Sequence, residues 1–186
     1  MSDRLTQFLA TSYTAYHAAE NAEELLLKNG FARLNETDDW TISEGGKYFV
    51  VRNGSAIVAF TVGALDQFAF RIVASHTDSP ALKLKENAVT MNGPYARLNA
   101  EKYGGGIWYS FFDRPLKIAG RLVVREDGAI RSETAESDFF VTVPSLAVHM
   151  NRGVNDGFSV NAQTDLQPLL SLSPEGAPDF PALLSD

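Results

Sequence analysis

The sequence has 186 residues, of which 45% are hydrophobic and 11% aromatic, which excludes wholesale disorder because enough apolar surface is present to build a core. A net charge of −7 argues against a general nucleic-acid-binding role, since such a role requires a basic face. The lack of cysteine excludes disulfides, cysteine-ligated zinc sites and a cysteine nucleophile.

A chain of this length corresponds to one ordinary domain or to parts of two. No apolar run approaches the roughly 20 residues that cross a bilayer, and the N-terminal segment lacks the apolar core of a signal peptide. We therefore expect a cytoplasmic protein that does not bind membranes.

The first third of the chain predicts helices followed by a hairpin. Apolar residues recur with helical spacing over residues 3–29, with a local break around residues 12–14. Strand patterns at 47–52 and 56–62 flank Asn53-Gly54, a dipeptide typical of a two-residue hairpin turn. A third strand is predicted over residues 68–75.

The segment after this third strand carries the most informative polar residues. The apolar run at 70–74 predicts a buried strand, so His76 and Asp78 follow its carboxyl end, where open α/β sheets place their chemistry. A metal-binding imidazole held by a nearby carboxylate is one interpretation of this pair. Two others stay open: His76 as a hydrogen-bonded core histidine, and Asp78 as a turn residue before Ser79-Pro80.

Beyond Pro80 the pattern changes to short strands separated by turn residues, with no convincing helix. We place a domain boundary near residue 87, between an α/β segment and an all-β segment. The predicted strands are 82–86, 95–99, 107–111, 116–125, 129–133 and 139–143.

Other candidate residues give weaker signals. His17 lies in the helical region, where packing or capping is the commoner role, and a lone histidine such as His149 is also more often structural than catalytic. The glycines at 104–106 lack the spacing of a phosphate-binding loop, so nucleotide binding is rejected. Ser75 and Ser79 lack the G-x-S-x-G context of a serine hydrolase.

Several segments together resemble the aspartyl aminopeptidase family of zinc metallopeptidases. They are IVASHTDSPALKLK at 72–85, EKYGGGIWYSFFDRPLKIAGRLVV at 101–124 and VPSLAVHMNRGVND at 143–156. The helical segment at 8–31 also resembles the opening helix of that family. The resemblance spans nearly the whole chain, and the GGGIW, FDR-x-L and HTDSP blocks make it specific.

The resemblance implies roles for three residues. His76 matches the first zinc-ligand histidine, and Asp78 matches the aspartate that orients a ligand. His149 matches a histidine that reaches into the active site of a neighbouring subunit and helps to bind substrate or the transition state. The implied reaction removes N-terminal Asp or Glu from peptides, with two zinc ions activating a water whose proton a glutamate accepts.

The resemblance also implies the fold class: α/β, with the first part of an α/β/α zinc-peptidase catalytic domain at 1–86 and an inserted, incomplete all-β dimerisation domain at 87–186. We expect homo-oligomers formed through the β domain. The family's remaining metal ligands and general base lie C-terminal to that domain, so we expect this chain alone to be inactive. The alternative function is a non-catalytic module for self-association.

Overall fold

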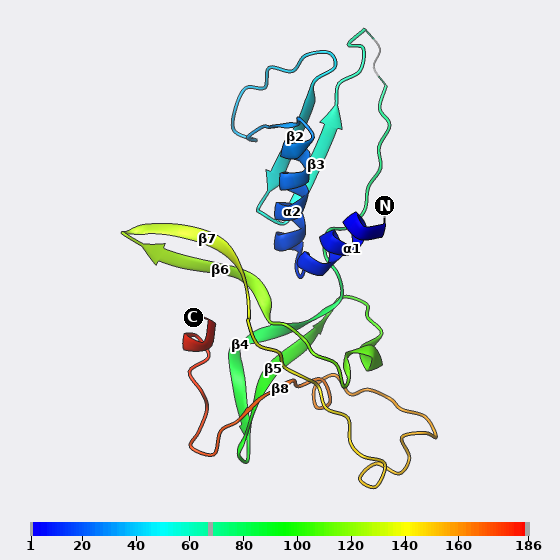
Figure 1. Ribbon diagram of the computed structural model, residues 1–186, viewed down its shortest axis with the longest axis vertical. Coiled ribbons are helices and arrows are strands. Elements are labelled where there is room, and N and C mark those ends of the chain that lie inside the picture. The colour runs from blue at the N-terminus through cyan, green and yellow to red at the C-terminus, as the bar shows by residue number, and fades with distance from the viewer. Residues whose placement is uncertain (1, 67–68, 185–186) are drawn as a thin grey trace. The chain divides into compact units, whose positions relative to one another are not determined.

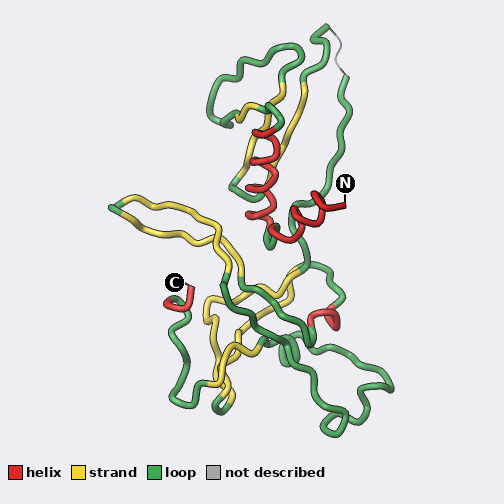
Figure 2. The backbone as a smooth tube through the Cα atoms, viewed as in Figure 1, coloured by secondary structure: helices red, strands yellow, loops and turns green. Residues whose placement is uncertain are grey.

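A computed structural model of the chain describes residues 2–66 and 69–184. Figures 1 and 2 show α-helices at the N-terminal end, followed by strands that alternate with long irregular segments. The elements in chain order are α1 (Ser2–Thr11), α2 (Ala15–Lys28), β1 (Ala32–Arg33), β2 (Lys47–Arg52), β3 (Ala56–Thr61), β4 (Ala81–Asn92), β5 (Tyr95–Tyr103), the 3-10 helix η1 (Trp108–Phe111), β6 (Ala119–Glu126), β7 (Ala129–Glu136), β8 (Leu169–Leu172) and the 3-10 helix η2 (Ala182–Leu184).

The chain divides into two compact units. Unit 1 contains Met1–Ser79 and Ala119–Ala135, and unit 2 contains Pro80–Ile118 and Glu136–Asp186. The β6–β7 hairpin therefore belongs to unit 1, although its chain segment lies between the two segments of unit 2. Helices on a mixed sheet in unit 1 and antiparallel strands in unit 2 agree with the predicted α/β class.

The helical region is interrupted where the sequence predicts, at residues 12–14. Thr14 is the N-cap of α2, and its hydroxyl lies 2.8 Å from Nδ1 of His17, which is buried. The predicted packing and capping role of His17 is therefore confirmed. Within the described residues, neither α1 nor α2 nor any other helix is long and apolar enough to cross a membrane.

The sheet of unit 1 has the order β1-β2-β3, and α2 lies against it (Figure 1). Phe49 and Val50 on β2 are its buried residues, with exposed fractions of 0% and 8%. The predicted β2–β3 hairpin is confirmed, and Asn53 and Gly54 both have positive φ, at 52° and 68°. Because Arg52 pairs with Ala56, the connection has three residues rather than the expected two.

The β6–β7 hairpin turns at Asp127-Gly128, between the predicted strands 116–125 and 129–133, and both residues have positive φ. Within unit 1 the hairpin contacts α2. One contact is a hydrogen bond of 2.7 Å, which the hydroxyl of Thr134 donates to Oε2 of Glu20. The hairpin is therefore attached to unit 1 by side chains rather than by continued strand pairing.

Unit 2 is built on the antiparallel sheet β4-β5-β8 (Figure 2). Alternate residues of β5, namely Ala96, Leu98 and Ala100, are buried at 1% exposure or less. Val141 and Val143 belong to the same core, with exposures of 4% and 0%. The period of two on β5 is typical of a strand with one covered face.

Two predicted strands of this half are wrong. Residues 107–111 form no strand: Trp108–Phe111 is the 3-10 helix η1, and the hydroxyl of Ser110 donates to the backbone oxygen of Ile107 at 2.6 Å. Residues 139–143 make only isolated bridges, because their partner segment around Pro115 cannot continue a ladder. Strand β8 was not predicted, since a four-residue segment with three leucines gives too short a pattern.

Candidate functional site

His76 and Asp78 lie together in the irregular segment between β3 and β4. Nδ1 of His76 is 2.7 Å from the backbone oxygen of Asp78 and 3.1 Å from its Oδ1. Both oxygens accept hydrogen bonds, so Nδ1 carries a proton in this contact, and in the neutral ring the lone pair is then on Nε2. Asp78, two residues after His76, thus sets the tautomer of the His76 ring.

This tautomer fits a zinc ligand, because metal-binding histidines commonly donate their other ring N–H to a carboxylate or a carbonyl oxygen. The side chain of His76 is 80% exposed, so its ring is accessible to a metal. Over residues 2–66 and 69–184, however, no group of three or more His, Asp or Glu side chains is placed to hold a metal ion. His76 therefore fits one position of a zinc site, and the described part of the chain does not supply the others.

The predicted strand before His76 is not formed. Phe68 lies outside the described residues, and residues 69–75 form no strand. The apolar run is exposed instead, with Phe70 at 73%, Ile72 at 83% and Val73 at 100%, and Figure 1 draws this part of the chain as a loop. A strand requires a hydrogen-bonded neighbour, and no described strand pairs with this segment.

His149 lies in unit 2, in the segment between Val143 and β8 that contains neither helix nor strand, which we call loop 144–168. The backbone N–H groups of Met150 and Asn151 both donate to the carbonyl oxygen of Ala147, which forms a turn around His149. The His149 side chain is exposed and makes no hydrogen bond or ion pair with the described residues. Such an imidazole is free to contact another molecule, unlike a core histidine.

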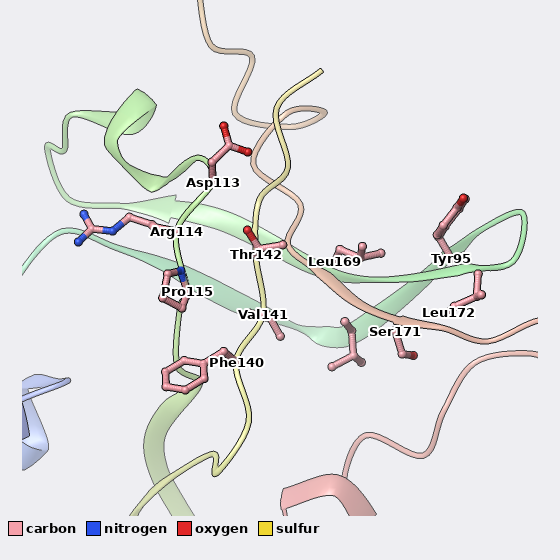
Figure 3. Close-up of a pocket in the computed structure, with 11 residues that line it drawn as sticks. Tyr95, Asp113, Arg114, Pro115, Phe140, Val141, Thr142, Leu169, Ser171 and Leu172 are labelled. Atoms are coloured by element: carbon pink, nitrogen blue, oxygen red, sulfur yellow. The ribbon is translucent and has the colours of Figure 1, made fainter. Parts of the chain in front are cut away.

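Unit 2 contains a cavity of about 440 Å³ whose lining includes Asp113 and the segment 140–142. Figure 3 shows Asp113 and Arg114 at the end of this cavity opposite Tyr95, with residues of β8 along its wall. The wall is mainly apolar, and it includes Val141 and Leu169. Asp113 therefore lines the cavity and also contacts loop 144–168, through its hydrogen bond with Ser145.

Asp113 makes hydrogen bonds on both sides of Pro144, the first residue of this loop. Its backbone N–H donates to the oxygen of Val143 at 2.9 Å, and its Oδ1 accepts from the backbone N–H of Ser145 at 2.9 Å. Hydrogen bonds from the side chain and then the backbone of Ser145 hold the pKa of the Asp113 carboxyl below its ordinary value. Asp113 has φ of 57°, a conformation that aspartate tolerates better than most residues.

The structure thus brings His76 and Asp78 together in unit 1 and places His149 in unit 2. Asp113 was not among the predicted site residues, because it falls between the predicted strands 107–111 and 116–125. The hydrogen bond between Asp113 and Ser145 joins positions 32 residues apart, and no local sequence pattern predicts it. The FDR-x-L block within the family resemblance was the one signal that pointed to this segment.

Comparisons with known proteins agree with the family resemblance. The model of the family described as aminopeptidase I zinc metalloprotease (M18) matches residues 8–181. A probable M18 family aminopeptidase 2 from Clostridium acetobutylicum is 41% identical over 175 residues, which are 91% of this chain and 40% of that protein. The chain spans about two fifths of the length of the curated relatives that it matches.

Solved structures show the same fold. A structure of an Ape4 and Nbr1 complex superimposes with a TM-score of 0.86 at 40% identity, covering 91% of this chain and 33% of that chain. The mApe1 dodecamer of S. cerevisiae gives a TM-score of 0.67 at 26% identity, covering 92% of this chain and 48% of that one. Because the family model matches nearly the whole chain, this protein belongs to the M18 family of aminopeptidase I zinc metalloproteases.

Proposed function

We propose that the gene product containing this chain is a zinc-dependent aminopeptidase that removes N-terminal Asp or Glu from peptides. Membership of the M18 family supports the peptidase and zinc chemistry. The acidic specificity rests on the resemblance to aspartyl aminopeptidases. The observation that carries the proposal is the contact between Nδ1 of His76 and the two oxygens of Asp78, which presents Nε2 as a metal donor.

His76 would hold one of two zinc ions through Nε2, and Asp78 would keep the ring in the tautomer and orientation that this requires. Bound zinc supplies a Lewis acid that polarises a peptide carbonyl and lowers the pKa of a bound water. Ligands other than His76 would complete the coordination of each zinc ion. The contribution of this chain is therefore one oriented imidazole and its supporting carboxylate.

The proposal also assigns the two parts of the chain to different domains. Residues 1–86 would belong to the catalytic domain, and residues 87–186 to a β-rich dimerisation domain. In a cytoplasmic homo-oligomer, His149 would contact the substrate bound by a neighbouring subunit. The exposed position of His149 in loop 144–168 supports this role, and the dodecameric assembly of the S. cerevisiae relative supports the oligomer.

A second function, self-association without catalysis, is proposed for the 186-residue chain in isolation. The exposed apolar residues Phe70, Ile72 and Val73 favour association, because a continuous apolar surface is stabilised when a partner covers it. The described residues also lack a group of three metal-binding side chains. We expect the isolated chain to self-associate and to show no peptidase activity.

Zinc content and substrate preference test the first proposal. The purified gene product should contain about two zinc ions per subunit, as the family resemblance implies, and should cleave peptides that begin with Asp or Glu faster than matched peptides beginning with Leu or Lys. His76→Ala should remove one zinc, whereas His149→Ala should lower kcat and leave the zinc content unchanged. Full zinc occupancy in His76→Ala contradicts the ligand assignment, and a preference for Leu contradicts the specificity.

A further inference from the structure

Loop 144–168 has 25 residues without helix or strand, a length at which unstructured connections in compact domains are usually functional. It carries the exposed His149. A histidine on such a loop can serve a substrate only if the two ends of the loop are fixed. The residues that fix the two ends of the loop therefore determine where His149 is placed.

The C-terminal end of the loop is fixed by burial. Leu166 is 1% exposed, and Gln167 is buried with its side-chain amide paired to the backbone of Ala100. Nε2 of Gln167 donates to the oxygen of Ala100 at 3.1 Å, and the N–H of Ala100 donates to Oε1 at 3.3 Å. The side-chain amide of Gln167 thus pairs with the backbone of β5 as a neighbouring strand would, which fixes the position at which the loop enters β8.

The N-terminal end lacks such burial and depends on Asp113. Phe112 bridges Val143 in parallel, but the next residue of that segment is Pro144, which has no N–H to continue a ladder. The carboxylate of Asp113 reaches past the proline and accepts from the N–H of Ser145. Figure 3 shows this carboxylate pointing away from Pro115, near the segment that continues from Thr142.

A second contact from the same segment reaches further along the loop. The ring of Phe112 meets the ring of Phe158 edge to face, with centroids 5.6 Å apart. His149 lies between these two points of attachment, four residues beyond Ser145. Four residues span at most about 14 Å when extended, so releasing Ser145 lets the imidazole move by several ångströms.

We propose that Asp113 is a positioning residue for His149, acting through the hydrogen bond from its carboxylate to the backbone N–H of Ser145. This inference rests on the proposed role of His149 at the substrate of a neighbouring subunit. Asp113 itself touches neither substrate nor metal in this account. Its effect on catalysis passes through the placement of loop 144–168.

Two substitutions at position 113 separate the hydrogen bond from the backbone conformation. Asp113→Gly tolerates φ of 57° but removes the acceptor, whereas Asp113→Asn tolerates the same φ and keeps an acceptor oxygen. In the oligomeric gene product, with aspartyl-p-nitroanilide as substrate, Asp113→Gly should lower kcat about tenfold, since a displacement near 1 Å already costs up to about 100-fold. Asp113→Asn should stay within about twofold, and zinc content should be unchanged in both.

A double-mutant cycle with His149→Ala distinguishes positioning from general destabilisation. If Asp113 acts through His149, Asp113→Gly lowers kcat in the wild-type background and has no further effect in the His149→Ala background. An equal fold-loss in both backgrounds overturns the inference, because it indicates an effect independent of His149. Hydrogen exchange gives an independent readout: Asp113→Gly should deprotect the Ser145 amide, and unchanged protection also overturns it.

Failure of the proposed function has a different signature. If His149→Ala leaves kcat unchanged, then His149 does not serve the substrate, and the inference about Asp113 fails with it. If His149→Ala lowers kcat and Asp113→Gly does not, the role of His149 stands and the inference alone is overturned.

Discussion

Arg121 on β6 lies over the aromatic ring of Tyr16 on α2, with its guanidinium carbon 4.6 Å from the ring centroid. The same guanidinium donates from Nη1 to the backbone oxygen and to Oδ1 of Asn53, both at 3.4 Å. One arginine therefore joins the β6–β7 hairpin, α2 and the β2–β3 turn within unit 1. A two-stranded hairpin is marginally stable by itself, so these contacts matter for its order.

Replacing Arg121 by alanine should loosen the hairpin. We expect a loss of about 1 kcal/mol in the free energy of unfolding, a typical size for an exposed cation–π contact with an added hydrogen bond. Amides of β6 and β7 should exchange faster with deuterium. Arg125→Ala, on the same strand, is the matched control, because Arg125 makes no contact of this kind with the described residues; equal effects of the two substitutions contradict the prediction.

Phe49 is the largest fully buried side chain of unit 1, with no exposed surface. Phe49→Ala should cost about 3–5 kcal/mol in denaturant unfolding, since it removes apolar burial and leaves a cavity. Val58, on the neighbouring strand β3, is 65% exposed, and Val58→Ala should change stability by less than about 0.5 kcal/mol. Similar costs at both positions are incompatible with this account of the core.

The contact of His76 with two oxygens predicts a partial effect of removing the Asp78 carboxylate. In Asp78→Ala the backbone oxygen, 2.7 Å from Nδ1, still accepts the ring proton, so the tautomer is kept. We expect zinc affinity of the gene product to fall by about 10-fold, at the lower end for loss of a supporting partner. Competition with a chelator measures this, with Thr77→Ala as the control. Complete loss of one zinc in Asp78→Ala would falsify this account of the tautomer.

The lowered pKa of Asp113 predicts a pH dependence for the start of loop 144–168. The ionised carboxylate is a stronger acceptor than the neutral acid, so its added contribution is fully present above the ordinary value of 3.8 and is lost as pH falls through the lowered pKa in the folded state. The amide resonance of Ser145 should therefore titrate with a midpoint below 3.8. It should not titrate in Asp113→Asn. A midpoint at or above the ordinary value contradicts the hydrogen bond.

Local signals were sufficient for part of the fold. Asn53 and Gly54 adopt the positive φ that their dipeptide predicts, and the break at residues 12–14 separates α1 from α2 as expected. Both features depend on residues adjacent in sequence. The same holds for His76 and Asp78, whose spacing of two suffices to bring the ring and the carboxylate together.

Features that depend on distant partners could not be predicted in this way. The run at 70–74 has the composition of a buried strand, but composition does not supply the neighbour that a strand requires. The bridge between Thr142 and Leu169 and the hydrogen bond between Asp113 and Ser145 likewise join positions 27 and 32 residues apart. Tertiary pairing, which the sequence pattern does not contain, decides these regions.

The discontinuity of unit 1 also has a consequence for how the protein folds. The hydrogen bond between Glu20 and Thr134 closes a separation of 114 residues, and β4 and β5 of unit 2 are synthesised before β6 and β7 emerge. Because such long-range closure is entropically costly, contacts of this kind slow folding. During translation, α2 and the β2–β3 hairpin therefore cannot contact the β6–β7 hairpin until residues up to 135 have emerged from the ribosome.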